Sequence, residues 1–191
     1  MAIPINIEDL LNKRKIESNR IEFKKGWNPD KIYRTICAFA NDFDNIGGGY
    51  IVVGIEEEER TGIAKRPVTG VPIEALNDIQ KDMVGYNNKI EPYYMPRIDV
   101  QEVDGKSVLV IWAPAGVNRP YNVRERVTAK QSPSKWYIRS GTSTIEAKGE
   151  VLDELREMAN RTPFDERGNE RIEISDISPA LVLDYLQTVG S

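Results

Sequence analysis

Residues Ile36–Ile55 read ICAFANDFDNIGGGYIVVGI and join an apolar helical stretch, three consecutive glycines and an unbroken apolar run. The run Tyr50–Ile55 lacks polar alternation, which is typical of a strand buried on both faces. Glycine has no Cβ and tolerates positive φ, so Gly47–Gly49 indicates a close approach between backbones. Glycines that bind phosphate precede a helix, whereas here the chain passes from helix to strand. The stretch therefore predicts a packing joint and not a phosphate loop.

Four glutamates, residues 56–59, follow this strand directly. The simpler interpretation is a solvated loop, with Glu22 paired to a lysine. The alternative is a carboxylate site, in which Glu56 joins Glu17 and Glu22 if a strand over 17–25 pairs beside the strand over 50–55. Three carboxylates near one point, with Lys24 beside them, would hold Mg²⁺ or Mn²⁺ for phosphodiester hydrolysis.

Composition describes an ordinary globular protein of 191 residues, with 40% hydrophobic and 29% charged residues. No apolar run approaches the roughly 18 residues of a membrane span, so no membrane association is expected. Cys37 is the single cysteine and there is no histidine. These counts exclude an internal disulfide, histidine base catalysis and a cysteine- or histidine-based metal site, and they fit a reducing cytoplasm. A buried, inert thiol is expected for Cys37.

The net charge of −4 is unevenly distributed. Residues 105–149 carry 8 Lys/Arg and 2 Asp/Glu, whereas residues 150–191 carry 4 and 10. Basic residues neutralise phosphates and aromatic side chains stack on bases, so this basic stretch is a candidate polyanion site. The alternative is a mobile loop whose aromatic residues anchor it to the core. The candidate nucleic-acid contacts are Lys24, Lys25, Arg119, Arg124, Arg126, Lys130, Lys135, Trp136 and Arg139.

Apolar periodicity predicts an α+β fold, with helices packed on a mixed β-sheet in a two-layer sandwich. Strands are expected over 17–25, 50–55, 97–103, 107–112 and 136–139, and helices over 7–15, 31–43, 73–86 and 147–158. Asp104-Gly105 is a strong hairpin signal between the third and fourth of these strands. The main domain is placed at 1–160. Residues 161–191 are interpreted as an acidic linker and a helix that lead toward a C-terminal region absent from this chain.

Four ordered blocks of sequence resemble the Schlafen AlbA_2 domain, and the resemblance covers about residues 8–160. The blocks are Glu17-Ser-Asn-Arg-Ile-Glu-Phe-Lys24, Cys37-Ala-Phe-Ala-Asn41, Gly47-Gly-Gly-Tyr-Ile-Val-Val-Gly-Ile55 and Tyr137-Ile-Arg-Ser-Gly-Thr-Ser-Thr144. Phe164-Asp-Glu-Arg167 also looks like the family's bridge to an ATPase-like or winged-helix region. The resemblance implies an Alba-like fold and nucleic-acid binding, as in the DNA-binding modules of bacterial transcriptional regulators.

The resemblance also carries two enzymatic implications. Animal Schlafen proteins have a ribonuclease site of three carboxylates, to which Glu17, Glu22 and Glu56 correspond. Glu56 stands where an aspartate is usual, and its longer side chain changes the geometry. The family is often labelled "divergent AAA", which implies ATP binding, but the chain has no Walker motif.

These observations lead to one preferred hypothesis and two alternatives. The first is a non-enzymatic DNA-binding or, more generally, nucleic-acid-binding domain of a cytoplasmic bacterial transcriptional regulator. The second is an endoribonuclease that uses Mg²⁺ or Mn²⁺ on Glu17, Glu22 and Glu56. The third is an ATP-binding protein of the divergent AAA type, or an interaction platform. A homodimer is one assembly that such a platform would form.

Overall fold

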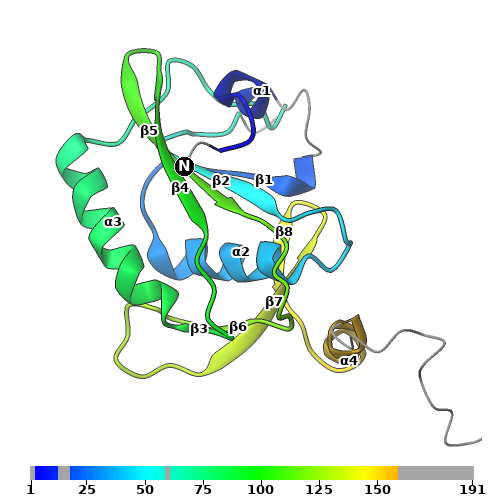
Figure 1. The fold of residues 1–191 in the computed structure, drawn as a ribbon. Coiled ribbons are helices and arrows are strands. Elements are labelled where there is room, and N and C mark those ends of the chain that lie inside the picture. Colours follow the sequence, from blue (N-terminus) through cyan, green and yellow to red (C-terminus); the bar gives the residue numbers. More distant parts are fainter. Residues whose placement is uncertain (1–2, 13–17, 59–60, 159–191) are drawn as a thin grey trace, which may run out of the picture. The chain divides into compact units, whose positions relative to one another are not determined.

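The computed structural model describes residues 3–12, 18–58 and 61–158, which belong to one compact unit spanning residues 1–159. The linker and helix predicted over 161–191 lie outside the described residues. Helices and two four-stranded sheets make up the unit, so the predicted α+β class is confirmed (Figure 1). None of its described helices is both long and apolar enough to cross a membrane.

The first sheet has the order β1-β2-β5-β4. Strand β1 pairs parallel with β2, and the other pairs are antiparallel, so the sheet is mixed as predicted. The bounds are β1 Ile21–Lys24, β2 Gly49–Val53, β4 Arg97–Val103 and β5 Lys106–Ala113.

The second sheet has the order β3-β6-β7-β8 and was not predicted. Its strands are β3 Ile90–Glu91, β6 Asn122–Arg124, β7 Ser134–Ser140 and β8 Ser143–Glu146. No strand was expected between residues 113 and 135, whereas β6 lies there and pairs with both β3 and β7. Gly141 and Thr142 form the tip of the β7–β8 hairpin.

The helices are α1 Ile7–Leu11, α2 Pro29–Asn41, α3 Ile73–Asn87 and α4 Glu150–Met158, with a short 3₁₀ turn at Ser18–Arg20. Helices α2 and α3 contribute to one core cluster with one face of β2 and β5, including Ile51 and Leu109. Helix α1 contributes Leu10 and Leu11 to a second cluster, with Val52 and Val110 from the opposite face of the same strands. Burial of β2 on both faces explains its unbroken apolar sequence.

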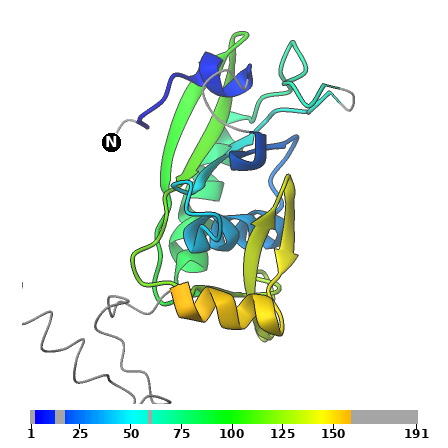
Figure 2. The same cartoon turned by 90° about the vertical axis from the view of Figure 1, so that its right-hand side faces the viewer.

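Helix α2 contacts the first sheet and also β6, β7 and β8 of the second (Figures 1 and 2). Asn28 caps its first turn by accepting a hydrogen bond from the Lys31 N–H at 3.1 Å, which satisfies a backbone donor that the helix leaves open. Near its end, the buried Asn41 amide donates to the carbonyls of Tyr121 and Tyr137 at 2.9 and 2.8 Å. Asn41 therefore connects the helix to the segment before β6 and to β7.

Cys37 lies within α2 and is completely buried, as predicted. Burial raises the pKa of its thiol to about 12, because the thiolate would lose its hydration. The side chain behaves as a small apolar group whose Sγ lies 3.3 Å from the Tyr121 carbonyl.

The glycine turn packs as tightly as the sequence analysis predicted. A Cβ on Gly49 would lie 2.3 Å from the Phe39 ring and 2.6 Å from the Arg20 carbonyl oxygen, and one on Gly48 would lie 2.1 Å from the Ala113 carbonyl oxygen. The helix end and β5 therefore approach the turn too closely for any side chain.

Asp42 fixes the path of this turn, which the sequence analysis did not predict. It ends α2 in the left-handed conformation, with φ 44°. Its buried carboxylate accepts hydrogen bonds from the N–H groups of Ile46, Gly47 and Gly48, at 3.0 to 3.1 Å. A side chain thus satisfies turn amides that have no strand or helix partner there.

The β4–β5 hairpin confirms the turn signal of Asp104-Gly105. Both residues have positive φ, 51° and 71°, as a two-residue type I′ connection requires. The Asp104 carboxylate also accepts from the Val68 N–H at 3.0 Å and pairs with Arg66 at 2.8 Å. The hairpin is thereby attached to the loop that follows the glutamates.

We predict that Gly49→Ala destabilises the protein by at least about 2 kcal/mol, because the new methyl group would overlap both Phe39 and the backbone. Gly85→Ala is the matched control: Gly85 lies in α3 with no atom near its Cβ position, so alanine there is expected to stabilise by about 0.5 to 1 kcal/mol. Urea unfolding measures both changes. Equal stability of the two variants would contradict the packing-joint interpretation.

Candidate nucleic-acid interface

A polar pocket of about 350 Å³ lies where β1, α2 and the β7–β8 turn meet, and we call it the basic pocket. Cations, hydroxyl groups and one carboxylate surround it. Its lining residues are Glu22, Lys24, Lys31, Arg34, Thr35, Thr142, Ser143 and Thr144. Three lysine and arginine side chains against one glutamate give the lining a net positive charge.

Local structure explains how these side chains reach one place. Strand alternation in β1 buries Ile21 and Phe23 on one face and directs Glu22 and Lys24 to the other. In α2, Lys31 and Arg34 are three residues apart and so lie on the same side of the helix. The β7–β8 turn adds the hydroxyl groups of Thr142, Ser143 and Thr144.

Arg139, near the end of β7, links β1 to the β7–β8 turn. Its side chain is 7% exposed, and its Nη1 donates to Glu22 Oε2 at 2.7 Å. The same guanidinium donates to the carbonyls of Asn19 and Thr142, at 3.2 and 2.7 Å, and it lies 5.1 Å from the centroid of the Phe39 ring. Arg139 was predicted to contact nucleic acid, whereas its donors are used inside the protein.

A chain of hydroxyl groups continues from this guanidinium across the pocket. Arg139 Nη1 donates to Thr144 Oγ1 at 2.8 Å, and Thr144 Oγ1 lies 3.1 Å from Thr35 Oγ1. Thr35 Oγ1 in turn donates to the Lys31 carbonyl at 3.3 Å. Since Thr35 gives its single hydroxyl proton to the Lys31 carbonyl, it accepts from Thr144, and the donors follow the order Arg139, Thr144, Thr35. The chain fixes the hydroxyl orientations on this side of the pocket.

Arg34 and Lys135 hold the segment between β6 and β7 in place. Arg34 donates twice to the Glu125 carbonyl, at 3.0 and 2.8 Å. Lys135 lies 2.7 Å from the Glu125 carboxylate and 3.3 Å from that of Glu146. The hydrogen bond to Glu125 raises the pKa of Lys135 and lowers that of Glu125. Lys135, a predicted nucleic-acid contact, is therefore neutralised within the described part of the chain.

Two more of the predicted contacts have structural partners. Arg119 donates to the carbonyls of Asn41 and Asp42, at 3.2 and 3.0 Å, and so stabilises the end of α2. Trp136 packs against α4, where the Arg156 guanidinium lies 5.6 Å from its ring centroid.

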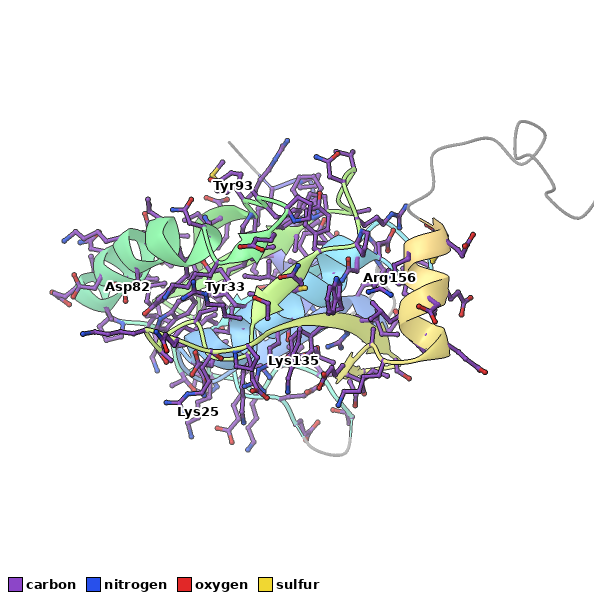
Figure 3. The ribbon with its side chains drawn as sticks, turned by 90° about the horizontal axis from the view of Figure 1, so that it is seen from below. Lys25, Tyr33, Asp82, Tyr93, Lys135 and Arg156 are labelled. Atoms are coloured by element: carbon purple, nitrogen blue, oxygen red, sulfur yellow. The ribbon has the colours of Figure 1, made fainter. Side chains whose placement is uncertain are left out.

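The remaining predicted cations lie toward solvent. Lys25, Arg126 and Lys130 are exposed, and Lys25 points away from the ribbon in Figure 3. Arg124 donates to the Lys130 carbonyl at 3.1 Å, which closes the loop between β6 and β7. Only Lys24 of the predicted set lines the basic pocket.

The two described carboxylates of the predicted metal site take part in different ion pairs. Glu22 contacts Lys24 at 2.5 Å as well as Arg139, and Glu56 contacts Lys25 and Lys65 at 3.2 and 3.4 Å. Lys25, followed by Lys65, lowers the pKa of Glu56 through hydrogen bonds. Among the residues described, no group of three or more acidic or thiol side chains is placed to hold a metal ion. Glu17 lies outside the described residues, so the three-carboxylate site stays a prediction.

Most of the pocket lining was not predicted from the sequence, and the unpredicted residues are Lys31, Arg34, Thr35, Thr142, Ser143 and Thr144. Two signals were present. Lys31 and Arg34 have helical spacing on the polar side of α2, and the three hydroxyl residues of the turn belong to a block that carried the family resemblance.

Residues 17–148 match the family described as Schlafen, AlbA_2. The chain belongs to the Schlafen AlbA_2 family. The matched range of this AlbA_2 domain contains every residue that lines the basic pocket.

Two solved structures are similar to this AlbA_2 domain. The DIP2311 protein of Corynebacterium diphtheriae is 21% identical with a TM-score of 0.49, and the match covers 88% of this chain but 29% of that one. The second is the N-terminal domain of a Nitrosomonas europaea protein named as related to the ATP-dependent DNA helicase RecG. It is 26% identical with a TM-score of 0.48, and the match covers 71% of this chain and 88% of that one. No curated protein matches the chain.

We predict that Glu22→Ala destabilises the AlbA_2 domain by about 2 to 3 kcal/mol, because it leaves the Arg139 guanidinium buried without its counter-charge. Glu56→Ala is the control, since it removes a carboxylate from an exposed ion pair and is expected to cost less than about 1 kcal/mol. Chemical denaturation of the two variants gives the comparison. A loss for Glu22→Ala no larger than that for Glu56→Ala would rule out a structural role for the buried pair.

Proposed function

We propose that this AlbA_2 domain binds nucleic acid, with the basic pocket as the place where a backbone phosphate is held. The observation that supports it is the convergence of Lys24, Lys31 and Arg34 with four hydroxyl side chains in one concavity. Ammonium, guanidinium and hydroxyl groups are the donors that proteins present to phosphate oxygens. Family membership supports the same class of ligand.

The contacts available in the pocket are of the kind that position a nucleic-acid backbone. They contain no described aromatic side chain on which a base would stack, and hydroxyl and cationic groups do not distinguish one base from another when they bind phosphate. We therefore propose that the pocket supplies affinity that does not depend on sequence, and that exposed Lys130 and Arg126 extend the contact along the strand.

The setting that we propose is DNA binding within a bacterial transcriptional regulator, and this setting rests on the family resemblance. A non-enzymatic role agrees with the state of Glu22, the acidic residue of the pocket lining. Cations occupy both of its carboxylate oxygens, because Lys24 donates to one and Arg139 to the other.

We expect the affinity for a fluorescein-labelled DNA duplex to fall steeply with salt. Exposed Lys31, Arg126 and Lys130 together would give about three phosphate contacts and a slope of log K against log salt of about −3, since each neutralised phosphate releases condensed counterions. Lys31→Ala should weaken binding several-fold and reduce that slope by about 1. Fluorescence anisotropy between about 50 and 200 mM salt measures both quantities.

Lys81→Ala is the matched control, because Lys81 is an exposed lysine on a different helix, α3, where it lies 3.6 Å from Asp78. It removes the same charge from the chain and should leave affinity and slope nearly unchanged. An equal effect of the two variants would place the binding surface elsewhere. Absence of binding at low salt would contradict the proposed function itself.

A further inference from the structure

The basic pocket contains hydrogen-bond donors that the protein itself does not use. Lys24 gives one ammonium proton to Glu22 and keeps two. Arg34 gives protons of Nε and Nη2 to the Glu125 carbonyl, which leaves its Nη1 group. Lys31 is exposed, and its ammonium has no ion-pair partner in the described part of the chain. Both β1 and α2 therefore contribute unused cationic donors to the pocket.

The β7–β8 turn contributes donors from a third side, because this hairpin stands beside α2 (Figure 2). Thr142 and Ser143 are exposed and line the pocket. Neither hydroxyl group has a partner among the described residues, whereas the Thr144 hydroxyl is bound to Arg139 and Thr35. A hydroxyl group without a fixed partner can rotate to donate to a ligand. Cationic and neutral donors thus surround the same volume.

The charge of the pocket is larger than one internal phosphate would neutralise. Glu22 is the single carboxylate among the described residues of the lining, and Arg139 pairs with it inside the protein. With Arg139 included, four cations face this carboxylate, which leaves a surplus of three positive charges. An internal phosphate carries one negative charge. A terminal phosphomonoester carries about −1.5 to −2 at pH 7 and has three strong acceptor oxygens, so it matches the pocket more closely.

The size of the pocket also suits the end of a strand. Its volume of about 350 Å³ lies within the range of roughly 300 to 1,000 Å³ that is usual for pockets that enclose small ligands. There is room for a terminal phosphate together with part of its sugar. An internal phosphate has a nucleotide on each side, and both would have to leave a concavity that three elements of the fold border.

We propose that the basic pocket binds the phosphorylated end of a nucleic-acid strand in preference to an internal phosphate, an inference that rests on the proposed function. Lys24, Lys31 and Arg34 bind the terminal phosphomonoester through their unused donors. The hydroxyl groups of Thr142 and Ser143 donate to its remaining oxygen atoms. An internal phosphate occupies the same place, more weakly, when the strand ends in a hydroxyl group. The 5′ and 3′ ends of a strand can carry the same group, so both are tested.

Exposed cations next to the pocket favour a nucleic acid over a phosphorylated peptide. Arg126 and Lys130 are exposed and lie on the segment between β6 and β7, which Arg34 holds through the Glu125 carbonyl. A nucleic-acid strand presents a charge at each further phosphate, so these two side chains continue the contact. A phosphopeptide offers the phosphate group at one point only.

Three forms of one DNA duplex, labelled with fluorescein on an internal base, test this preference. The first has hydroxyl groups at every end, the second has 5′-phosphates and the third has 3′-phosphates. One phosphorylated form should bind at least about tenfold more tightly than the hydroxyl form, because charge-assisted hydrogen bonds are added. The form that gains affinity identifies the end. Lys31→Ala should remove most of the difference between the forms.

Arg126→Ala is the control, since Arg126 is an exposed cation outside the pocket lining. It should weaken the three forms alike and preserve the ratio of their affinities, and thermal unfolding should show that both variants are folded. Equal affinity for the three forms, or a preference that Lys31→Ala leaves intact, would overturn the inference while the proposed function stands. Absence of binding by every form at low salt would contradict the proposed function itself. A phosphoserine peptide that binds as tightly as the phosphorylated duplex would overturn the inference in favour of a phosphoprotein.

Discussion

The buried guanidinium of Arg139 holds the second sheet against the edge of the first. It lies on β7 and donates hydrogen bonds to the Glu22 carboxylate on β1, to the Asn19 carbonyl before β1 and to a carbonyl in the β7–β8 turn. The Phe39 ring of α2 lies beside it. A planar group with five donors suits this place, because it satisfies several acceptors at fixed angles, which a lysine could not do. Its buried charge is offset by Glu22, which Lys24 also contacts. The shape and the charge of the basic pocket both depend on this arrangement.

Helix α2 is the second constraint, because both sheets pack on it. Its last residues connect it to both sheets. Asn41 donates hydrogen bonds to the carbonyl of Tyr121, just before β6, and to that of Tyr137, within β7. The Asp42 carboxylate accepts hydrogen bonds from the glycine turn that leads into β2. These polar groups are buried and hydrogen-bonded, because a buried polar group without a partner would destabilise the fold. These contacts set the backbone positions from which Lys31 and Arg34 reach the pocket, and two hydrogen bonds to the Glu125 carbonyl hold the Arg34 side chain there. A site that is formed in advance lowers the entropy cost of binding.

Features encoded by neighbouring residues could be predicted from the sequence. The Asp104-Gly105 hairpin, the buried β2, the tight glycine turn and the facing of Glu22 and Lys24 all follow from local chemistry or strand alternation. The second sheet could not be predicted, because β6 has three residues and forms only by pairing with strands that lie far from it or follow a loop. For a related reason, the sequence could not show which of its basic residues have partners within the protein. Sequence shows that Arg119, Lys135 and Arg139 are basic, but only the fold shows that carbonyls and carboxylates inside the protein occupy them.

The central claim is that Glu22 and Arg139 act as one unit that joins the sheets. A double-mutant cycle tests it most directly, with unfolding free energies measured for Glu22→Ala, Arg139→Ala and the double variant. We predict a coupling energy of at least about 1.5 kcal/mol, because each single change already removes the interaction that the other would break. Free-energy changes that add to within about 0.5 kcal/mol would contradict the account.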